Sequence, residues 1–100
     1  MLSKLDNKTM KLVSMAESIA FDLGACAVGT EHVILAVLKM KDCKLCKILE
    51  RNSVNYKVFN DKIIEVFGKK DVKPYYMEYT LKTFALLKFF YYQKFYFLKD

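Results

Sequence analysis

The strongest constraint on the fold is an apolar run preceded by a glycine, a hydroxyl residue and a carboxylate, at residues 28–38 (VGTEHVILAVL). Thr30 stands where a helix N-cap belongs, because its side-chain oxygen can accept from the free amides of the first turn. Glu31 adds negative charge near the positive end of the helix dipole, and Gly29 lets the chain turn sharply before the cap. The continuous apolar pattern also allows a buried strand, but the cap and the leucine and alanine content favour a short buried helix on which the other helices pack.

The composition supports an all-α fold in one small domain. One hundred residues allow a single core, and 54% of them are hydrophobic, which is enough to fill it. Three glycines and one proline leave room for few turns. We therefore expect about five helices joined by short connections.

A first helix is predicted from Asp6, whose carboxylate can cap it, to about Leu23, with Gly24 as the C-cap residue that ends it. Its apolar residues recur at three- and four-residue steps, which places them on one stripe. These residues are Leu12, Val13, Ala16, Ile19, Ala20 and Leu23.

Two further helices follow the central one. Asp42 is the expected N-cap of the third helix, and Asn52 or Ser53 closes it. Asn55 is the expected N-cap of the fourth helix, which Gly68 ends. The third helix is expected to point Leu45, Cys46, Ile48 and Leu49 inward, and the apolar residues that repeat in the fourth are Val58, Phe59, Ile63, Val66 and Phe67.

These helix boundaries divide the chain into three segments. Residues 1–68 form a four-helix unit, and residues 69–79, which are charged and contain the proline, form a linker. Residues 80–100 begin another helix, in which Thr80 takes the N-cap role.

Leu23-Gly24, four residues, and then Gly29-Thr30-Glu31-His32-Val33-Ile34-Leu35 resemble the repeat signature of the N-terminal domain of the Clp family of AAA+ unfoldases. The resemblance extends over the predicted four-helix unit, about two thirds of the chain. It implies one full Clp N repeat, followed by the first helix of a second repeat that the chain does not complete.

This resemblance implies a non-catalytic module that binds substrate or adaptor proteins in ATP-dependent proteolysis. In bacterial relatives the glutamate of this motif takes part in recognising phosphorylated arginine, with a hydroxyl at the start of the first helix nearby. Glu31 matches that glutamate, but Asp6 stands where the hydroxyl is usual and should repel a phosphoryl group. The residues that the resemblance assigns to such a ligand are Asp6, Thr30, Glu31 and Thr80. An alternative role for Glu31 is to stabilise its own helix.

The segment 81–98 (LKTFALLKFFYYQKFYFL) is apolar or aromatic nearly all round and is expected to be one helix. A membrane span is disfavoured because the stretch is short and contains lysines. The favoured interpretation is that it packs on the first unit and on a second copy of the chain, as a homodimer, and the remaining one is a truncated repeat without a role. The expected interface anchors are Tyr91, Tyr92, Phe95, Tyr96 and Phe97.

The net charge of +6 comes mainly from lysine, with Arg51 as the one arginine. Sequence-specific nucleic-acid binding relies more on arginine, so we expect no nucleic-acid partner. Residues 1–9 are polar and lack the apolar core of a signal peptide, which favours a cytoplasmic protein with reduced thiols.

No constellation points to catalysis. Cys43 and Cys46 have metal-like spacing and, with Cys26 and His32, supply the ligand types of a zinc site. We favour packing roles for these thiols and a structural role for the histidine. No Walker-type phosphate loop is present, so the sequence predicts neither enzyme activity, nor a cofactor, nor a bound metal. The alternative to the binding module is a self-associating helical protein without a dedicated ligand.

Overall fold

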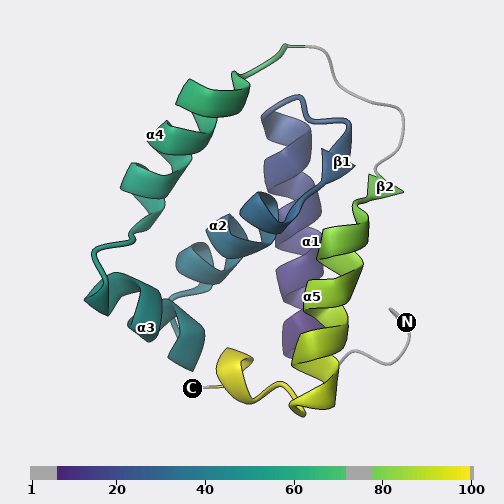
Figure 1. Ribbon diagram of the computed structural model, residues 1–100, viewed down its shortest axis with the longest axis vertical. Helices are drawn as coiled ribbons and strands as arrows, with labels where there is room; N and C mark the ends of the chain where they lie inside the picture. The colour runs from purple at the N-terminus through teal and green to yellow at the C-terminus, as the bar shows by residue number, and fades with distance from the viewer. Residues whose placement is uncertain (1–6, 72–77, 100) are drawn as a thin grey trace.

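The computed structural model describes residues 7–71 and 78–99, which contain five α-helices, two short strands and one 3-10 helix (Figure 1). This content confirms the all-α prediction. In chain order the elements are α1 (Asn7–Asp22), β1 (Ala27–Val28), α2 (Thr30–Met40), α3 (Lys44–Arg51), α4 (Tyr56–Phe67), β2 (Glu78–Tyr79), α5 (Leu81–Tyr92) and the 3-10 helix η2 (Tyr96–Leu98).

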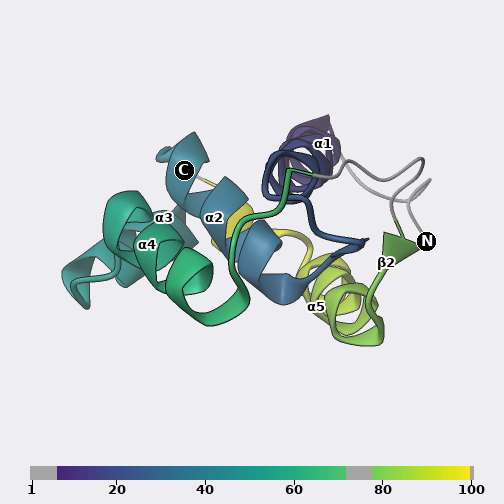
Figure 2. The ribbon, with the colours of Figure 1, turned by 90° about the horizontal axis from the view of Figure 1, so that it is seen from above.

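Helix α2 is the centre of the molecule, as its apolar sequence predicts. It contacts α1, α3, α4 and α5, and Figure 2 shows α1 and α5 on one side of it and α3 and α4 on the other. Nearly every α2 side chain between the first turn and the last is buried: His32, Val33, Leu35, Ala36, Val37 and Leu38. A helix buried on this scale is stabilised by packing more than by helix propensity.

Helix α1 lies along α2 and buries the predicted stripe. The buried members are Leu12, Val13, Ala16, Ile19 and Ala20, and Leu23 packs against them in a half-buried position. Large aliphatic residues at these steps therefore supply one wall of the core.

The end of α1 is the predicted glycine C-cap. Gly24 has a φ of +72°, its amide donates to Phe21 O at 3.0 Å and the amide of Ala25 donates to Ala20 O at 3.0 Å. This pair of hydrogen bonds is the Schellman arrangement. A Cβ at residue 24 would lie 2.3 Å from the carbonyl oxygen of Lys70, so glycine is needed here for its conformation and for its size.

Helix α3 begins one residue later than the sequence predicts. Its N-cap is Cys43, whose Sγ accepts from the amide of Cys46 at 3.4 Å, whereas the expected cap Asp42 is exposed. Residue 43 is fully buried, so core packing fixes its extended backbone and places the helix start after it. Ile48, expected to point inward, is exposed, while Asn52 closes the helix as predicted.

Helix α4 has the predicted ends and an unexpected surface. Asn55 Oδ1 accepts from the amide of Val58 at 2.9 Å, and Gly68 follows the last residue with a φ of +77°. Ile63 is buried, whereas Val58, Val66 and Phe67 are exposed. The reason is that α4 lies at one side of the molecule and packs mainly against α2, so only one side of it is covered (Figure 2).

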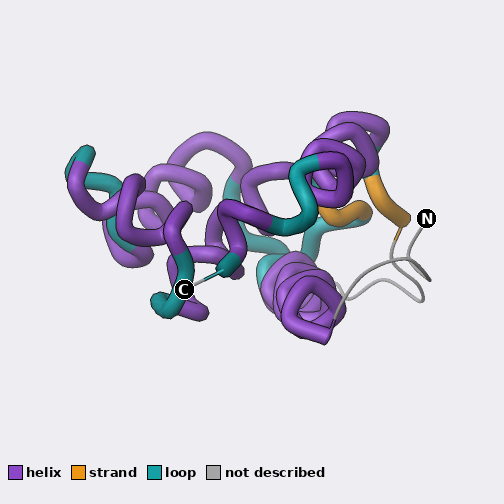
Figure 3. Tube along the Cα trace, turned by 90° about the horizontal axis from the view of Figure 1, so that it is seen from below, coloured by secondary structure: helices purple, strands orange, loops and turns teal. Residues whose placement is uncertain are grey.

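Two short parallel strands join distant parts of the chain, with Ala27 opposite Glu78 and Val28 opposite Tyr79. Figure 3 shows them side by side at one end of the molecule, between α1 and α5. The second strand falls in the segment expected to be a linker, of which residues 72–77 lie outside the described residues. Residues 78–79 are therefore paired with the four-helix unit.

Helix α5 begins as predicted and ends early. Thr80 Oγ1 accepts from the amide of Thr83 at 3.2 Å, which confirms the N-cap. The helix ends at Tyr92 instead of continuing to residue 98, because Lys94 and Phe95 adopt positive φ values of 54° and 61°. The prediction of one helix over residues 81–98 was therefore wrong.

The turn after α5 brings the C-terminal residues back onto α3. Leu98 is buried, and the carbonyl oxygen of Lys99 accepts from the amide of Lys44 at 2.7 Å. The turn buries Leu98 and gives the amide of Lys44, in the first turn of α3, a hydrogen-bond partner. Both effects favour the turn over a longer helix.

The inner face of α5 buries Thr83, Leu87 and Phe90, and the helix contacts α2. Part of the favoured interpretation, packing of this segment on the first unit, is thus confirmed. Within residues 7–71 and 78–99 no helix combines the length and the apolar character that crossing a bilayer requires.

Candidate binding cleft at the start of α2

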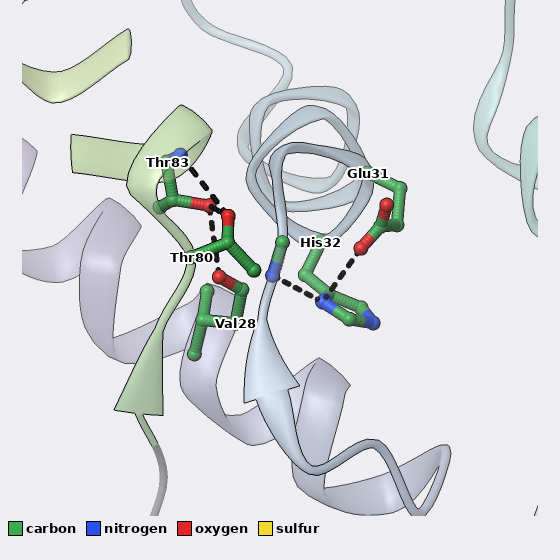
Figure 4. A network of polar contacts seen from close by, with 6 residues as sticks. Val28, Glu31, His32, Thr80 and Thr83 are labelled. Atoms are coloured by element: carbon green, nitrogen blue, oxygen red, sulfur yellow. Dashed lines mark hydrogen bonds and ion pairs between the residues drawn. The ribbon is translucent and has the colours of Figure 1, made fainter. Parts of the chain in front are cut away.

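The start of α2 differs by one residue from the prediction. Gly29, not Thr30, is the N-cap, and Thr30 is the first helical residue. Glycine has no side chain that could accept from the first-turn amides. The side chain of His32 instead reaches back, and its Nδ1 accepts from the amide of Gly29 itself at 2.9 Å (Figure 4). The carbonyl of Gly29 accepts from the amides of His32 and Val33 at 3.1 and 3.3 Å. His32 therefore makes the reciprocal half of a capping box and does not take the place of a hydroxyl cap.

His32 is buried and neutral in this network. Burial lowers the pKa of His32, and the adjacent Glu31 opposes that effect by raising it. Because Nδ1 accepts a hydrogen bond, the proton of the neutral ring lies on Nε2. The structural role expected for this histidine agrees with its contact to the helix start.

Glu31 folds back over the N-cap. Its Oε1 lies 3.4 Å from Nδ1 of His32, and its side chain is 30% exposed. A Cβ at Gly29 would lie 1.8 Å from that same oxygen. Gly29 has an extended backbone, with φ −97° and ψ 172°, which any residue can adopt. Glycine is therefore needed here because a side chain would collide with this carboxylate, and not because of the sharp turn that the sequence suggested.

A cleft of ≈ 220 Å³ opens beside this carboxylate. Its walls come from the turn after α1, the first residues of α2, and the end of α4 with the residues that follow it. Its polar residues include Cys26, Glu31, His32 and Lys70, and its apolar residues include Leu23, Ile63 and Phe67. The turn and the end of α4 are held together by a hydrogen bond of 3.0 Å from the amide of Lys70 to Leu23 O.

The residues that line the cleft include one with a carboxylate, one with an ammonium group and one with an aromatic ring. Glu31 can pair with a cationic group, and Lys70 can pair with an anionic one. Phe67, which is 64% exposed, lines the same space and offers an apolar contact or a face for a cation. Such a set suits a charged side chain carried on a partner protein.

Three of the four residues predicted for ligand binding belong to the described part of the chain, and these three do not converge. Glu31 lines the cleft, while Thr80 lies across the start of α2 beside Val28 and Thr83 (Figure 4). Thr30 is half-buried in the first turn, and Asp6 lies outside the described residues.

Thr80 and Thr83 form a local network around one carbonyl oxygen. The hydroxyl of Thr83 donates to Val28 O at 2.8 Å, and the amide of Thr80 donates to the same oxygen at 3.1 Å. The two hydroxyl oxygens are 2.8 Å apart, and because Thr83 has only one hydroxyl hydrogen, Thr80 is the donor between them. This network gives the Thr80 side chain a structural role at the start of α5.

The predicted interface aromatics surround the end of α5. Tyr92 and Tyr96 are exposed, whereas Tyr91 and Phe95 are half-buried and contact each other edge to face at 6.2 Å. The ammonium of Lys44 lies over the ring of Tyr96, 4.8 Å from its centre. These aromatic residues are therefore partly engaged within the chain and partly open to a partner.

The three cysteines lie in two places. Cys43 and Cys46 are buried at the start of α3, whereas Cys26 is exposed on the rim of the cleft. Burial raises the pKa of Cys46, which keeps it a thiol. In the described ranges, no group of three or more His, Cys, Asp or Glu side chains lies where it could hold a metal ion.

Sequence reasoning missed Phe67 and Lys70 as members of the cleft. Both belong to the end of α4 and the residues after it, about forty positions from Glu31 in the sequence. The sequence held no signal for either residue, because Phe67 follows the same apolar repeat as the rest of its helix and its exposure is known only from the structure.

Comparison with models of known protein families found no match to this chain, and comparison with curated protein sequences found none either.

Proposed function

We propose that the chain is a non-catalytic module that binds proteins through the cleft beside Glu31. The role would be that of a Clp N domain, which recognises substrate or adaptor proteins for ATP-dependent proteolysis in the cytoplasm. The proposal rests on the resemblance of residues 23–35 to the Clp N repeat and on the position of Glu31. The observation that carries it is the partly exposed carboxylate of Glu31 at the start of α2, which lines a cleft together with the exposed Phe67.

The charges in the cleft suit a ligand that is both cationic and anionic. A phosphorylated arginine side chain has a guanidinium, which pairs with a carboxylate such as Glu31, and a phosphoryl group, which pairs with an ammonium such as Lys70. Lys70 lines the cleft and is the cationic residue there that would pair with the phosphoryl group. Thr80 has no place in this proposal, because its hydroxyl serves the start of α5.

The experiment is a titration of the isotope-labelled protein with free phosphoarginine, with arginine and with inorganic phosphate, followed by NMR. We expect phosphoarginine to shift the amide signals of residues 24–32 and 67–71, and to bind at least about tenfold more tightly than arginine. Glu31→Gln should remove most of this binding. Glu50→Gln is the matched control, because Glu50 is exposed on α3.

Two outcomes would contradict the proposal. One is binding that is unchanged by Glu31→Gln, and the other is signal changes that lie away from the cleft. Lys70→Gln separates the two charges: weaker binding of phosphoarginine with unchanged binding of arginine would assign the phosphoryl contact to Lys70.

Self-association into a homodimer is a second candidate function. The observation that favours it is the exposure of Tyr92 and Tyr96, which are 77% and 54% exposed at the end of α5. Large aromatic side chains in such positions are common anchors of protein interfaces. Light scattering across a dilution series tests it: a mass of two chains that falls to one in Tyr92→Ser supports a homodimer, and a constant single-chain mass excludes one.

A further inference from the structure

Helix α5 has an outer face that is as apolar as its buried face. Its residues recur at four- and three-residue steps, which places them in one line along the helix. We call these four residues the α5 strip: Leu81, Ala85, Phe89 and Tyr92. Leu81 is 87% exposed and Phe89 is 48% exposed.

The strip lies outside the core, with one contact within the chain: the ring of Phe89 stacks on that of Phe97, and the ring centres are 6.2 Å apart. The residues that hold α5 to the core are Thr83, Leu87 and Phe90, on the opposite side of the helix. Figure 2 shows α5 at the edge of the molecule, away from α4 and on the other side of α2. An exposed apolar line along a peripheral helix is a feature of interaction surfaces.

Lysines border the strip, and residues 79–99 contain no acidic residue, with the exposed Glu78 directly before them. At 100° per residue, Lys82 falls at one edge of the strip and Lys88 at the other, and both are exposed. Residues 79–99 also contain Lys94 and Lys99 but no aspartate or glutamate. The surface is therefore apolar along its centre and positive along both sides.

We propose that the α5 strip binds an amphipathic helix with acidic flanks, supplied by another protein. An apolar line one helix face wide, with charges along both sides, is the pattern of a helix-to-helix seam in which flanking charges select the partner. Carboxylates beside the apolar anchors of the second helix would pair with Lys82 and Lys88. This proposal does not depend on the cleft at Glu31.

A second copy of the chain is a poorer occupant on the same evidence. Two strips facing each other would bring lysines together with no carboxylate from residues 79–99 of either chain, and like charges at an interface oppose association. Single-stranded nucleic acid needs several aromatic faces on which bases stack, whereas half of the strip is aliphatic. An anionic membrane surface would also attract Lys82 and Lys88, but a helix that lies in a membrane interface buries a broad apolar face, whereas the strip is one residue wide.

The test uses two synthetic helical peptides of about 20 residues. Both have leucine and isoleucine at three- and four-residue steps, and the flanking positions are glutamate in one and lysine in the other. We expect the glutamate peptide to bind at least about tenfold more tightly by fluorescence anisotropy, and its binding to weaken as salt is raised. In the charge-reversed variant Lys82→Glu/Lys88→Glu the order of the two peptides should invert.

Variants of exposed residues keep the fold and locate the binding site. Leu81→Ser and Tyr92→Ser should each weaken binding of the glutamate peptide by about tenfold or more. Val66→Ser, a change at a residue of α4 that is 65% exposed, should leave it unaltered. Glu31→Gln should also leave it unaltered, which separates this proposal from the one at the cleft.

Four results would overturn the proposal. Equal affinity for the two peptides removes the charge argument. Tighter binding to phosphatidylglycerol vesicles than to the glutamate peptide assigns the surface to a membrane. Tighter binding to an oligothymidine than to that peptide assigns it to nucleic acid. A homodimer that Leu81→Ser and Tyr92→Ser both dissociate assigns the strip to a second copy.

Discussion

The phenol of Tyr79 donates a hydrogen bond to the carboxylate of Glu17 and so joins β2 to the middle of α1. Burial and the bond to this carboxylate raise the pKa of Tyr79, which keeps the phenol a donor. The two residues are 62 positions apart in the sequence. One hydrogen bond thus connects the first helix with the segment that leads into α5.

Removing that donor should weaken the whole fold. We expect Tyr79→Phe to lower the free energy of unfolding by about 1 kcal/mol, because the half-buried carboxylate of Glu17 loses a partner. Urea denaturation followed by circular dichroism measures the change. Tyr92→Phe, an exposed tyrosine on α5, is the control and should have no effect. If Tyr79→Phe and Glu17→Ala are additive in the double variant, the bond contributes nothing.

The burial of His32 predicts a loss of stability in mild acid. Its pKa is lowered in the folded chain, whereas in the unfolded chain it has the ordinary value of about 6.5. The stabilising contribution is therefore complete above about pH 6.5 and is lost as the pH falls toward the folded value, by about 1.4 kcal/mol for each unit of lowering. Urea denaturation at several pH values between about 7.5 and about 5, a range that includes the histidine pKa of the unfolded chain, measures the loss.

His32→Asn is the matched variant for this measurement. Asparagine offers an oxygen that can accept from the amide of Gly29, but it does not titrate. The difference in stability between wild type and variant should change with pH over this range and level off below it. A constant difference would show that His32 titrates normally. Because the chain has one histidine, its NMR signal reports the folded pKa directly.

Two glycines with similar φ values should tolerate alanine differently. Gly24 and Gly68 have φ values of +72° and +77°, but only Gly24 is crowded: a Cβ added there would lie 2.3 Å from Lys70 O, whereas one added at Gly68 would meet nothing within 4 Å. Gly68→Ala should cost about 1 to 3 kcal/mol of conformational strain, because a φ of +77° with a ψ of 169° is adopted almost only by glycine. Gly24→Ala should cost more, at least about 3 kcal/mol, because its φ is also positive and the backbone of Lys70 must move as well. Thermal or urea denaturation compares them. Equal costs would mean that the residues after α4 do not pack on the end of α1.

Leu98 should be the most important residue of the C-terminal turn. It is buried at 1% exposure, so Leu98→Ala should lower the free energy of unfolding by about 2 to 4 kcal/mol. Leu81→Ala, the same change on an exposed leucine, should stay within about 0.5 kcal/mol of wild type. Urea denaturation of both variants tests the pair. Similar small effects in both would mean that η2 does not pack on α3 in solution.

Local chemistry was enough to predict most helix ends. Asn55 and Thr80 cap helices through their own side chains, and Gly24 and Gly68 end them through a backbone conformation that other residues adopt poorly. These effects act within one turn of helix, so the sequence carries them without knowledge of the rest of the fold.

The errors come from contacts between distant residues. Burial of Cys43 moves the start of α3 past Asp42, and burial of Leu98 ends α5 at a turn that has no glycine. At the candidate site, Glu31 was predicted from its motif, but Phe67 and Lys70 join it only because α4 returns to the end of α1. A pattern of nearby residues cannot encode these approaches.

The carbonyl oxygen of Val28 accepts hydrogen bonds from both Thr80 and Thr83, directly before the helix on which the core is built. During synthesis the chain emerges N-terminal end first. This oxygen therefore has neither donor until residues more than fifty positions further along the chain have been made. The four helices of residues 7–68 can therefore gather before the strand pair exists, but the start of α2 reaches its final state only when α5 arrives. In a chain that stops before residue 80 the Val28 oxygen lacks both of these donors, which only the complete chain supplies.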